Sequence, residues 1–456
     1  MALSSRDRWL AALFALQLLV AGVLGVVLVT SLDDTTRTTV VSGPAVGPQQ
    51  SAAPQATATR GTTGTKGTTG STTTSTSGGT KTGVTTPTGS TTVLKAGEPI
   101  KVGSIVSQTG AINFASSAQA TKAYFDQINR AGGVNGHKIV LDLRDDQLDP
   151  ARGKQQAQQL VAAGVFAFTG WRAPLTENGI VPFLEQNKIP LIGGYGEQEE
   201  YHSPYTYLFS ASYGHYGYQM GRFLAEKGVK KPGLVYITNS SASADDGLEK
   251  AFKDGFRSKG VTLSDSEIVV VDPTKPSYDD VVTQFQLDGV DGMATLLDQT
   301  AYNRLTQAQD RQAYRPIHAA SPLFVDPAVK QSSSTEGTYV TTDYEFVDGG
   351  GPAVQEYVSG VKAAYGSRAQ VNYFGEQGWL DAKVFVEAVR SLGASVTRDG
   401  LLKAMDKLSG KGGFGFTSDL AFGPGVRDLN RCVKFGRIVS KKVTRVTDWR
   451  CDGQPF

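Results

Sequence analysis

Polar and aromatic side chains follow the apolar segments of this chain, at the points where each segment ends. Such polar groups hydrogen-bond to small molecules, and aromatic rings pack against their flat or apolar parts. The residues concerned are Ser107, Gln108, Thr109, Phe114, Trp171, Arg172, Tyr195, Asn239, Asp298, Gln299 and Ser321, with Tyr213 and His215 from a nearby segment. This combination indicates noncovalent binding of a solute.

The first apolar segments have the pattern of a parallel βαβ unit. A predicted buried strand at Ile100–Val106 precedes a helix from about Ser117 to Arg130, which ends at two glycines that accept a left-handed backbone. Asn135-Gly136 then turns the chain into a second strand, Lys138–Arg144. Strand, helix and strand in this order predict parallel pairing with the helix as the crossover.

The same alternation continues to the end of the chain. Further strands are predicted at Phe166–Thr169, Pro190–Gly193, Lys231–Thr238, Glu267–Val271, Gly292–Asp298 and Pro316–Ala320. Helical patterns between them include Tyr216–Lys227, Asp246–Lys259, Tyr278–Leu287 and Ala301–Arg311. We therefore expect an α/β fold with two doubly wound, Rossmann-like lobes. Ligands bind beyond the carboxyl ends of strands in such sheets, so the residues at the strand ends are expected to face a cleft between the lobes.

Several of these side chains also have an interpretation that needs no ligand. The alternatives are turn capping for Ser107 and Thr109, a core or rim position for Trp171, a solvated charge or salt bridge for Arg172, and a hydrogen-bonded structural role for His215. Tyr195 lies between glycines and Asp298 ends an apolar strand. For these two residues we favour a position in the cleft.

Composition and motifs argue against other classes of function. The net charge is +2 with no basic stripe, so no nucleic-acid partner is expected. The four histidines include no HExxH pair, there is no G-x-S-x-G nucleophile motif, and Gly410–Gly415 lacks P-loop spacing. Asp145-Asp146 is interpreted as loop hydrogen bonding and not as a catalytic pair. We expect no enzyme activity, no metal and no cofactor.

The N-terminus indicates an extracytoplasmic protein. Arg6 and Arg8 precede an uncharged run from Trp9 to Leu32, about 24 residues that span roughly 36 Å as a helix. Residues 1–32 are therefore predicted to form an uncleaved transmembrane signal anchor with a cytoplasmic N-terminus, the alternative being a cleaved signal peptide and secretion. Residues 33–97 are rich in Thr, Ser and Gly and are predicted to be a disordered linker.

The amino-acid sequences of several segments resemble those of one family. The segments INRAGGVNGHKI and DDQLDP, near the first two strands, resemble the opening of branched-chain amino-acid-type (Leu/Ile/Val-binding-like) solute-binding proteins of ABC transporters. The segments GLVYITNSSASADDGL, NYFGEQGWLDAKVF and VKFGRIVSKKVTRV resemble later parts of the same family. The resemblance implies a type I periplasmic-binding fold with three crossovers between the lobes. It assigns 98–213 and 341–415 to lobe 1, and 214–340 and 416–456 to lobe 2.

The predicted site departs from the amino-acid binders of that family. They hold the ligand's carboxylate with hydroxyls and backbone N–H groups, and its ammonium with an acidic group and tyrosines. The expected tyrosine is Ala244 here, and the expected glutamate is Ser321. A buried ammonium without a carboxylate is costly, so an ordinary amino-acid site would require Asp298 as the substitute. The aromatic set Phe114, Trp171, Tyr195 and Tyr213 suits an aromatic or flat ligand, and Arg172 suits an anionic group.

The C-terminal hairpin implied by the resemblance explains the two cysteines. A two-residue turn at Lys441-Lys442 would place Cys432 opposite Cys451, and opposed residues lie within disulfide range. An extracytoplasmic location permits the bond. Two free thiols are the alternative.

The predicted function is solute capture for an ABC importer. We expect a monomer that binds a small amino-acid-like or small aromatic or organic-acid solute by closure of two lobes and delivers it to ABC permease subunits in the membrane. The alternatives are a ligand-sensing ectodomain that reports to a membrane partner, and a wall hydrolase on a stalk, for which no nucleophile constellation is present.

Overall fold

The computed structural model describes residues 89–110, 113–177, 179–196, 198–237, 247–263, 268–271, 275–322, 335–424, 427 and 430–452. The predicted anchor at 1–32, the predicted linker up to residue 88, and Asn239 lie outside these residues. Within the described ranges, no helix combines the length and the apolar character needed to cross a bilayer. Both sheets described below belong to one unit, Thr80–Phe456.

The first sheet is fully parallel and has the strand order β2-β1-β3-β4-β5. Its strands are β1 (Ile100–Ile105), β2 (Ile139–Arg144), β3 (Ala167–Thr169), β4 (Leu191–Ile192) and β5 (Thr206–Tyr207). The helices of this region are α2 (Ala115–Arg130), α3 (Pro150–Ala162), α4 (Pro174–Glu177) and α5 (Val181–Asn187), together with the 3₁₀ helix η1 (Gln198–Tyr201). The predicted βαβ unit is confirmed, because β1 pairs with β2 in parallel through the α2 crossover.

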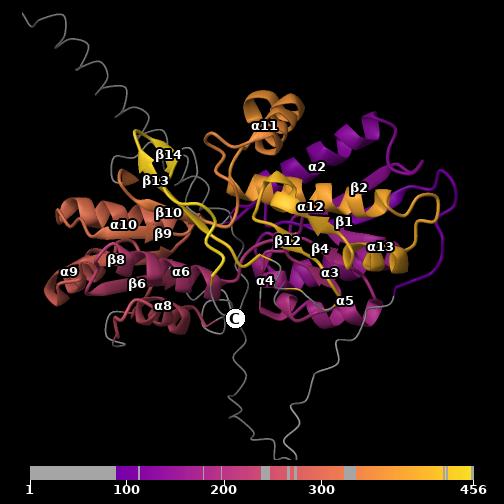
Figure 1. The fold of residues 1–456 in the computed structure, drawn as a ribbon. Coiled ribbons are helices and arrows are strands. Elements are labelled where there is room, and N and C mark those ends of the chain that lie inside the picture. The colour runs from indigo at the N-terminus through magenta and orange to yellow at the C-terminus, as the bar shows by residue number, and fades with distance from the viewer. Residues whose placement is uncertain are drawn as a thin grey trace, which may run out of the picture. The chain divides into compact units, whose positions relative to one another are not determined.

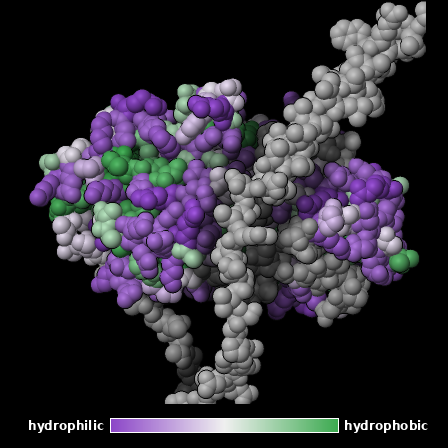
Figure 2. Space-filling model, turned by 180° about the vertical axis from the view of Figure 1, so that it is seen from behind, coloured by the Kyte–Doolittle hydropathy of each residue, from purple (hydrophilic) through white to green (hydrophobic). Residues whose placement is uncertain are grey.

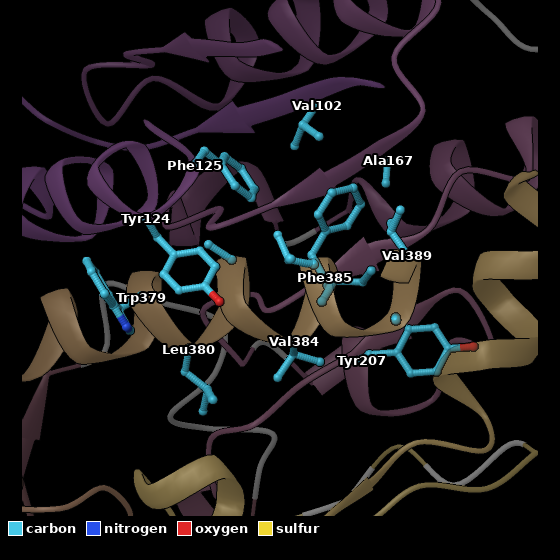
Figure 3. Packing of buried hydrophobic residues seen from close by; sticks show 14 of the residues in the cluster. Val102, Tyr124, Phe125, Ala167, Tyr207, Trp379, Leu380, Val384, Phe385 and Val389 are labelled. Carbon is cyan, nitrogen blue, oxygen red and sulfur yellow. The ribbon is translucent and has the colours of Figure 1, made fainter. Parts of the chain in front are cut away.

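The chain returns to this sheet much later in the sequence. Helix α12 (Tyr373–Arg390) packs along α2, and α11 (Pro352–Tyr365) and α13 (Arg398–Met405) accompany it (Figure 1). Figure 3 shows the resulting core, in which Tyr124 and Trp379 lie edge to face with ring centroids 5.0 Å apart. Phe125 and Phe385 form a second such pair at 5.8 Å. These large rings form part of the apolar core of this lobe.

The second sheet has the order β14-β13-β10-β9-β8-β6-β7. The parallel part consists of β6 (Pro232–Ile237), β7 (Ile268–Val271), β8 (Gly292–Leu296), β9 (Ile317–Ala320) and β10 (Tyr339–Thr342). An antiparallel hairpin, β13 (Lys434–Val439) and β14 (Lys442–Arg445), completes one edge. The helices are α6 (Tyr213–Glu226), α8 (Leu248–Arg257), α9 (Asp279–Asp288) and α10 (Gln299–Arg311). Short strands β11 (Ser409–Gly410) and β12 (Leu420–Ala421) form a separate pair, with the 3₁₀ helix η6 (Lys411–Gly415) between them.

The predicted two-lobed α/β class is thus observed as two sheets, each with its own helices. We retain 98–213 with 341–415, and 214–340 with 416–456, as the proposed division into lobes. Figure 2 shows that the face opposite to that of Figure 1 is mostly hydrophilic.

The C-terminal hairpin corrects one detail of the prediction. The turn lies at Ser440-Lys441, because Val439 pairs with Lys442, and not at Lys441-Lys442 as predicted. The register changes further along, since the carbonyl of Phe435 accepts hydrogen bonds from two successive amides, those of residues 446 and 447. This bulge adds two residues to the second strand. It brings Val433 opposite Arg450, and Cys432 and Cys451 form the predicted disulfide with Cα atoms 4.1 Å apart.

Removal of this disulfide is expected to reduce stability moderately. The bond closes a loop with a sequence separation of 19. The double substitution Cys432→Ser and Cys451→Ser should lower the free energy of unfolding by about 3 kcal/mol, because the unfolded chain regains loop entropy. Urea denaturation of the oxidised protein and the double variant would measure the difference. A difference below about 0.5 kcal/mol would contradict this expectation.

Candidate ligand site between the two lobes

Three crossover segments meet at Asp343, which follows β10. One carboxylate oxygen of Asp343 accepts hydrogen bonds from the hydroxyls of Tyr216 (2.7 Å) and Tyr373 (2.9 Å), and the other accepts from the amide of Ala211 (2.7 Å). Asn430, on the third segment, donates to the carbonyls of Phe209 (3.0 Å) and Asp343 (3.1 Å). Burial raises the pKa of the Asp343 carboxyl, while the tyrosine hydroxyls oppose the shift. These bonds tie together the segments at which the lobes would hinge.

A small cavity lies beside this junction, with a free volume of about 30 Å³. Residues near both sheets contribute to its wall. Most of them come from the first crossover between the lobes, at 210–216, and from the start of α12. The lining residues are Tyr195, Gly196, Ser210, Ala211, Tyr213, Tyr216, Leu296, Ser321, Pro322, Tyr373, Phe374 and Gln377. A volume of this size admits one or two waters but no organic solute.

A larger groove lies next to the cavity and shares Pro322 and Tyr373 with it. Its free volume is about 530 Å³, within the range of ligand-sized pockets. The wall is formed mainly by residues 345–348 after β10, by α11, by the start of α12 and by the β13–β14 hairpin. The cavity and the groove together provide more room than the cavity alone.

Aromatic rings dominate the cavity. Tyr195 follows β4 and Tyr213 is the first residue of α6, and their hydroxyls are 3.3 Å apart. Phe114 packs edge to face against Tyr195 at 5.5 Å and against Phe374 at 4.7 Å. Such a wall favours a flat or apolar solute over a strongly hydrated one.

Polar groups at the cavity are few and mostly hydrogen-bonded to each other. Gln377 donates to the hydroxyl of Ser210 (3.0 Å) and accepts from the guanidinium of Arg172 (2.9 Å). Arg172 in turn forms a fully buried salt bridge with Asp381 at 2.9 Å. The hydroxyl of Ser321 is different, because it is buried and has no hydrogen-bond partner within the described part of the chain. Burial of such a hydroxyl is costly, so Ser321 is the best candidate for a hydrogen bond to a solute.

The structure brings three of the predicted site residues into the cavity wall: Tyr195, Tyr213 and Ser321. Phe114 packs against the ring of Tyr195, and Arg172 donates to Gln377; neither lines the cavity itself. Tyr213 is the first residue of helix α6, which begins three residues earlier than predicted because Ser212 caps it.

The residues that follow β1 are occupied by hydrogen bonds to a neighbouring loop. Ser107 donates to Asp146 (2.7 Å), and both the Gln108 amide (3.0 Å) and the Thr109 hydroxyl (2.7 Å) donate to Asp145. The predicted role of the two aspartates in loop hydrogen bonding is confirmed. Their partners do not line the cavity, and a ligand role for Ser107, Gln108 and Thr109 stays a prediction.

Four other predicted site residues make contacts with residues close to them in the sequence and do not line the cavity. Trp171 is fully buried in the core against Phe168, at 4.7 Å, so its predicted place in the cleft was wrong. Asp298 caps α10 by accepting from the amides of residues 300 (2.7 Å) and 301 (3.0 Å), and Gln299 is the first residue of that helix. His215 contacts Ser212 at 2.8 Å, and burial lowers its pKa to about 4.

Sequence reasoning missed the residues at the start of α12 and on the first turn of α6. Tyr373, Phe374 and Gln377 belong to a helix far along the chain from the other cleft residues, and Tyr216 lies one helical turn after Tyr213. The helical spacing from Tyr213 was the available signal for Tyr216. For a metal site there is no candidate, since no group of three potential ligands occurs among the described residues.

Two parallel-sheet lobes with a small aromatic cavity between them define the class of type I periplasmic-binding folds. The sequence model described as "Periplasmic binding protein" matches residues 99–442, and the chain belongs to this family. A Leu/Ile/Val-binding protein homolog 3 from Brucella melitensis is 25% identical over 205 residues, 42% of this chain and 52% of that protein. A Leu/Ile/Val-binding protein from Rhizobium johnstonii is 29% identical over 98 residues, 20% of this chain and 26% of that protein. The chain therefore spans about half, or less, of the length of these curated relatives.

Solved structures with the same fold have different ligands in their descriptions. A fatty acid ABC transporter substrate-binding protein from Thermomonospora curvata has a TM-score of 0.68 at 17% identity, covering 79% of this chain and 95% of that one. A solute-binding protein from R. palustris in complex with benzoate has a TM-score of 0.66 at 15% identity, covering 76% of this chain and 95% of that one. A branched chain amino acid ABC transporter protein from Thermus thermophilus with bound valine has a TM-score of 0.68 at 16% identity, covering 79% of this chain and 98% of that one. At these identities the likeness shows the fold alone.

Proposed function

We propose that this chain is the extracytoplasmic solute-binding protein of an ABC importer. It captures a small solute between its two lobes and delivers the solute to permease subunits in the membrane. The observation that carries the proposal is the cavity, whose wall contains Tyr195 from lobe 1, Ser321 from lobe 2 and Tyr213 at the boundary between them. A site built from two lobes is assembled when they close on a ligand, which is the hinge-closure mechanism of binding proteins.

The free volume of the cavity supports a closed arrangement. About 30 Å³ is too small for any amino acid or aromatic acid. The lobes therefore have to separate before a solute enters, and the segments that meet at Asp343 are the natural hinge. In this proposal the solute replaces contacts such as the one between Tyr195 and Tyr213.

Within the range of amino-acid-like, aromatic and organic-acid solutes, a small aromatic solute fits the cavity best. The rings of Tyr195, Tyr213, Tyr373 and Phe374 line it, and the hydroxyl of Ser321, which has no partner among the described residues, can bind one polar group. The charged groups nearby are engaged: Arg172 with Asp381, and Asp343 with three donors. The relatives with benzoate and valine show that one fold serves both kinds of solute.

A thermal-shift screen with aromatic acids, amides and aliphatic amino acids tests the proposal. Saturation at 100 times Kd is expected to add about 2.7 kcal/mol of stability and to raise the melting temperature. Tyr195→Ala should weaken the binding of an aromatic hit about tenfold, because one ring contact is lost. Tyr365→Ala, at the end of α11 and outside the cavity wall, is the matched control. No shift with any solute, or equal weakening in both variants, would count against a solute site here.

Membrane tethering is part of the proposal. The uncharged run at 9–32 and the Thr/Ser/Gly-rich linker at 33–97 would hold the lobes outside the membrane, near the permease. The full chain is expected in the membrane fraction after a high-salt wash, and a version that starts at Glu98 in the soluble fraction. Release of the full chain as a shortened soluble protein would instead show cleavage of a signal peptide.

A further inference from the structure

The loop that carries Tyr195 rests on buried acidic side chains. It consists of residues 193–196 and follows β4. A methyl group added to Gly193 would lie 2.0 Å from the carboxyl carbon of Asp381, and one added to Gly194 would lie 2.4 Å from Glu200 and 3.0 Å from Glu177. The backbone thus approaches these acids as closely as only glycine allows.

Two fully buried glutamates hold this loop through its backbone. The amide of Tyr195 donates to Glu177 at 2.5 Å, and the amide of Gly196 donates to Glu200 at 3.0 Å. The second oxygen of Glu177 accepts from the amide of Ala173 at 2.7 Å. Glu177 and Glu200 thus hold two successive residues of the cleft loop, and Glu177 also binds the residue before α4.

The two glutamates also lie next to one another, because a methyl group on Gly194 would approach a carboxylate oxygen of each to 3.0 Å or less. Burial together with the neighbouring Glu200 charge raises the pKa of Glu177 well above its usual range. The other charged groups that face the pair are Arg172 and Asp381. They form a salt bridge with each other, so the single guanidinium is already shared with a third carboxyl group. A carboxyl–carboxylate hydrogen bond requires one proton, because two buried carboxylates in contact repel strongly.

We propose that Glu177 and Glu200 share one proton and act as positioning residues that set Tyr195 in the solute cleft. The significance of the pair for solute binding rests on the proposed function, whereas its effect on the loop does not. With the shared proton, both carboxyl groups keep their backbone donors and the loop is fixed. Without it, repulsion drives the two side chains apart and releases the amides of Tyr195 and Gly196.

The sign of the pH dependence follows from the raised pKa of Glu177. An unfolded glutamate loses its proton near pH 4.3, whereas the folded pair retains it to higher pH. Between these two pKa values the folded state binds more protons than the unfolded state, so the stability that the shared proton provides falls as pH rises. The loop is expected to loosen when the pH passes the folded pKa.

Amide hydrogen exchange of the full chain tests this inference without any solute. Exchange at Tyr195 and Gly196, corrected for the intrinsic pH dependence, should accelerate about tenfold at high pH, as expected for the loss of one hydrogen bond. Exchange at Phe168 in β3 should not change. Glu200→Gln can keep its carbonyl oxygen on the Gly196 amide while its N–H group donates to Glu177, so it should keep the two loop amides protected at all pH values. Glu177→Ala should expose them at every pH, and Glu185→Gln on α5 is the control for loss of a glutamate elsewhere.

The outcomes separate clearly. A pH-dependent loss of protection in the unmodified chain, abolished in the glutamine variant, supports the shared proton. Protection that is independent of pH in the unmodified chain overturns it, and this measurement remains available if the variants fail to fold. A glutamine variant as exposed as the alanine variant also overturns it. None of these results depends on the solute screen, so a failed screen would remove the proposed function and leave the proton-sharing pair in place.

Discussion

Replacing Arg172 with alanine is expected to lower the free energy of unfolding by about 3–5 kcal/mol. The guanidinium is fully buried, pairs with Asp381 at 2.9 Å and donates to Gln377 at 2.9 Å. Its removal leaves a buried carboxyl group without its cation, and this loss of a partner costs more than the intact pair contributes. Burial already raises the pKa of Asp381 to about 7 against the effect of Arg172. In the variant, Asp381 should therefore take up a proton at neutral pH.

Urea denaturation of the variant and of a matched surface variant measures this effect. Arg144 also pairs with an aspartate, Asp142, but the two side chains are 38% and 41% exposed. Arg144→Ala should cost at most about 1 kcal/mol, because water solvates both partners when the pair is broken. Similar losses in the two variants would mean that burial does not decide the strength of the Arg172 pair.

Asp343→Ala should produce the second large effect, a loss of about 3–5 kcal/mol, since each buried donor left unpaired costs about 1–3 kcal/mol and such costs add incompletely. The substitution deprives Tyr216, Tyr373 and the Ala211 amide of their acceptor. It also loosens the junction of the crossover segments. Small-angle scattering of the solute-free variant should show a larger radius of gyration, because the lobes separate more readily.

Two variants serve as controls for Asp343. Asp343→Asn keeps one oxygen for the tyrosine hydroxyls, so its loss should be smaller. Asp348→Ala removes a half-buried acceptor of the Val443 amide (3.0 Å), and about 1 kcal/mol is expected. An unchanged radius of gyration in Asp343→Ala, with only a small loss of stability, would show that the hinge does not depend on this carboxylate.

The sequence predicted the architecture better than the site. Alternation of apolar strands with helices, and turn glycines such as Gly132 and Gly136, depend on local chemistry and therefore identify the βαβ units. The rule that ligands lie beyond strand ends selected Tyr195 after β4 and Ser321 after β9, and both residues line the cavity. The same rule predicted that Trp171 lies in the cleft, whereas the structure places its ring in the core. The rule locates the backbone and does not determine the direction of each side chain.

The remainder depended on tertiary contacts. The side chains of Asp298 and Ser107 satisfy a helix N-terminus and a neighbouring loop, which are local requirements that compete with any ligand. Tyr373 and Gln377 enter the site from a helix that packs on α2, a contact that no local pattern in the sequence reveals. The displaced hairpin turn was hidden for a similar reason, because the bulge at Phe435 restores the predicted cysteine pairing.

The late return of α12 to the first sheet has a consequence for biogenesis. The partners Tyr124 and Trp379 are separated by roughly 250 residues, so the first lobe cannot complete its core until most of the chain has been synthesised. A polypeptide that crosses a membrane in this order exposes the apolar face of α2 while the whole second lobe is still emerging. The first lobe thus begins to be translated first but completes its core only after α12 has been made.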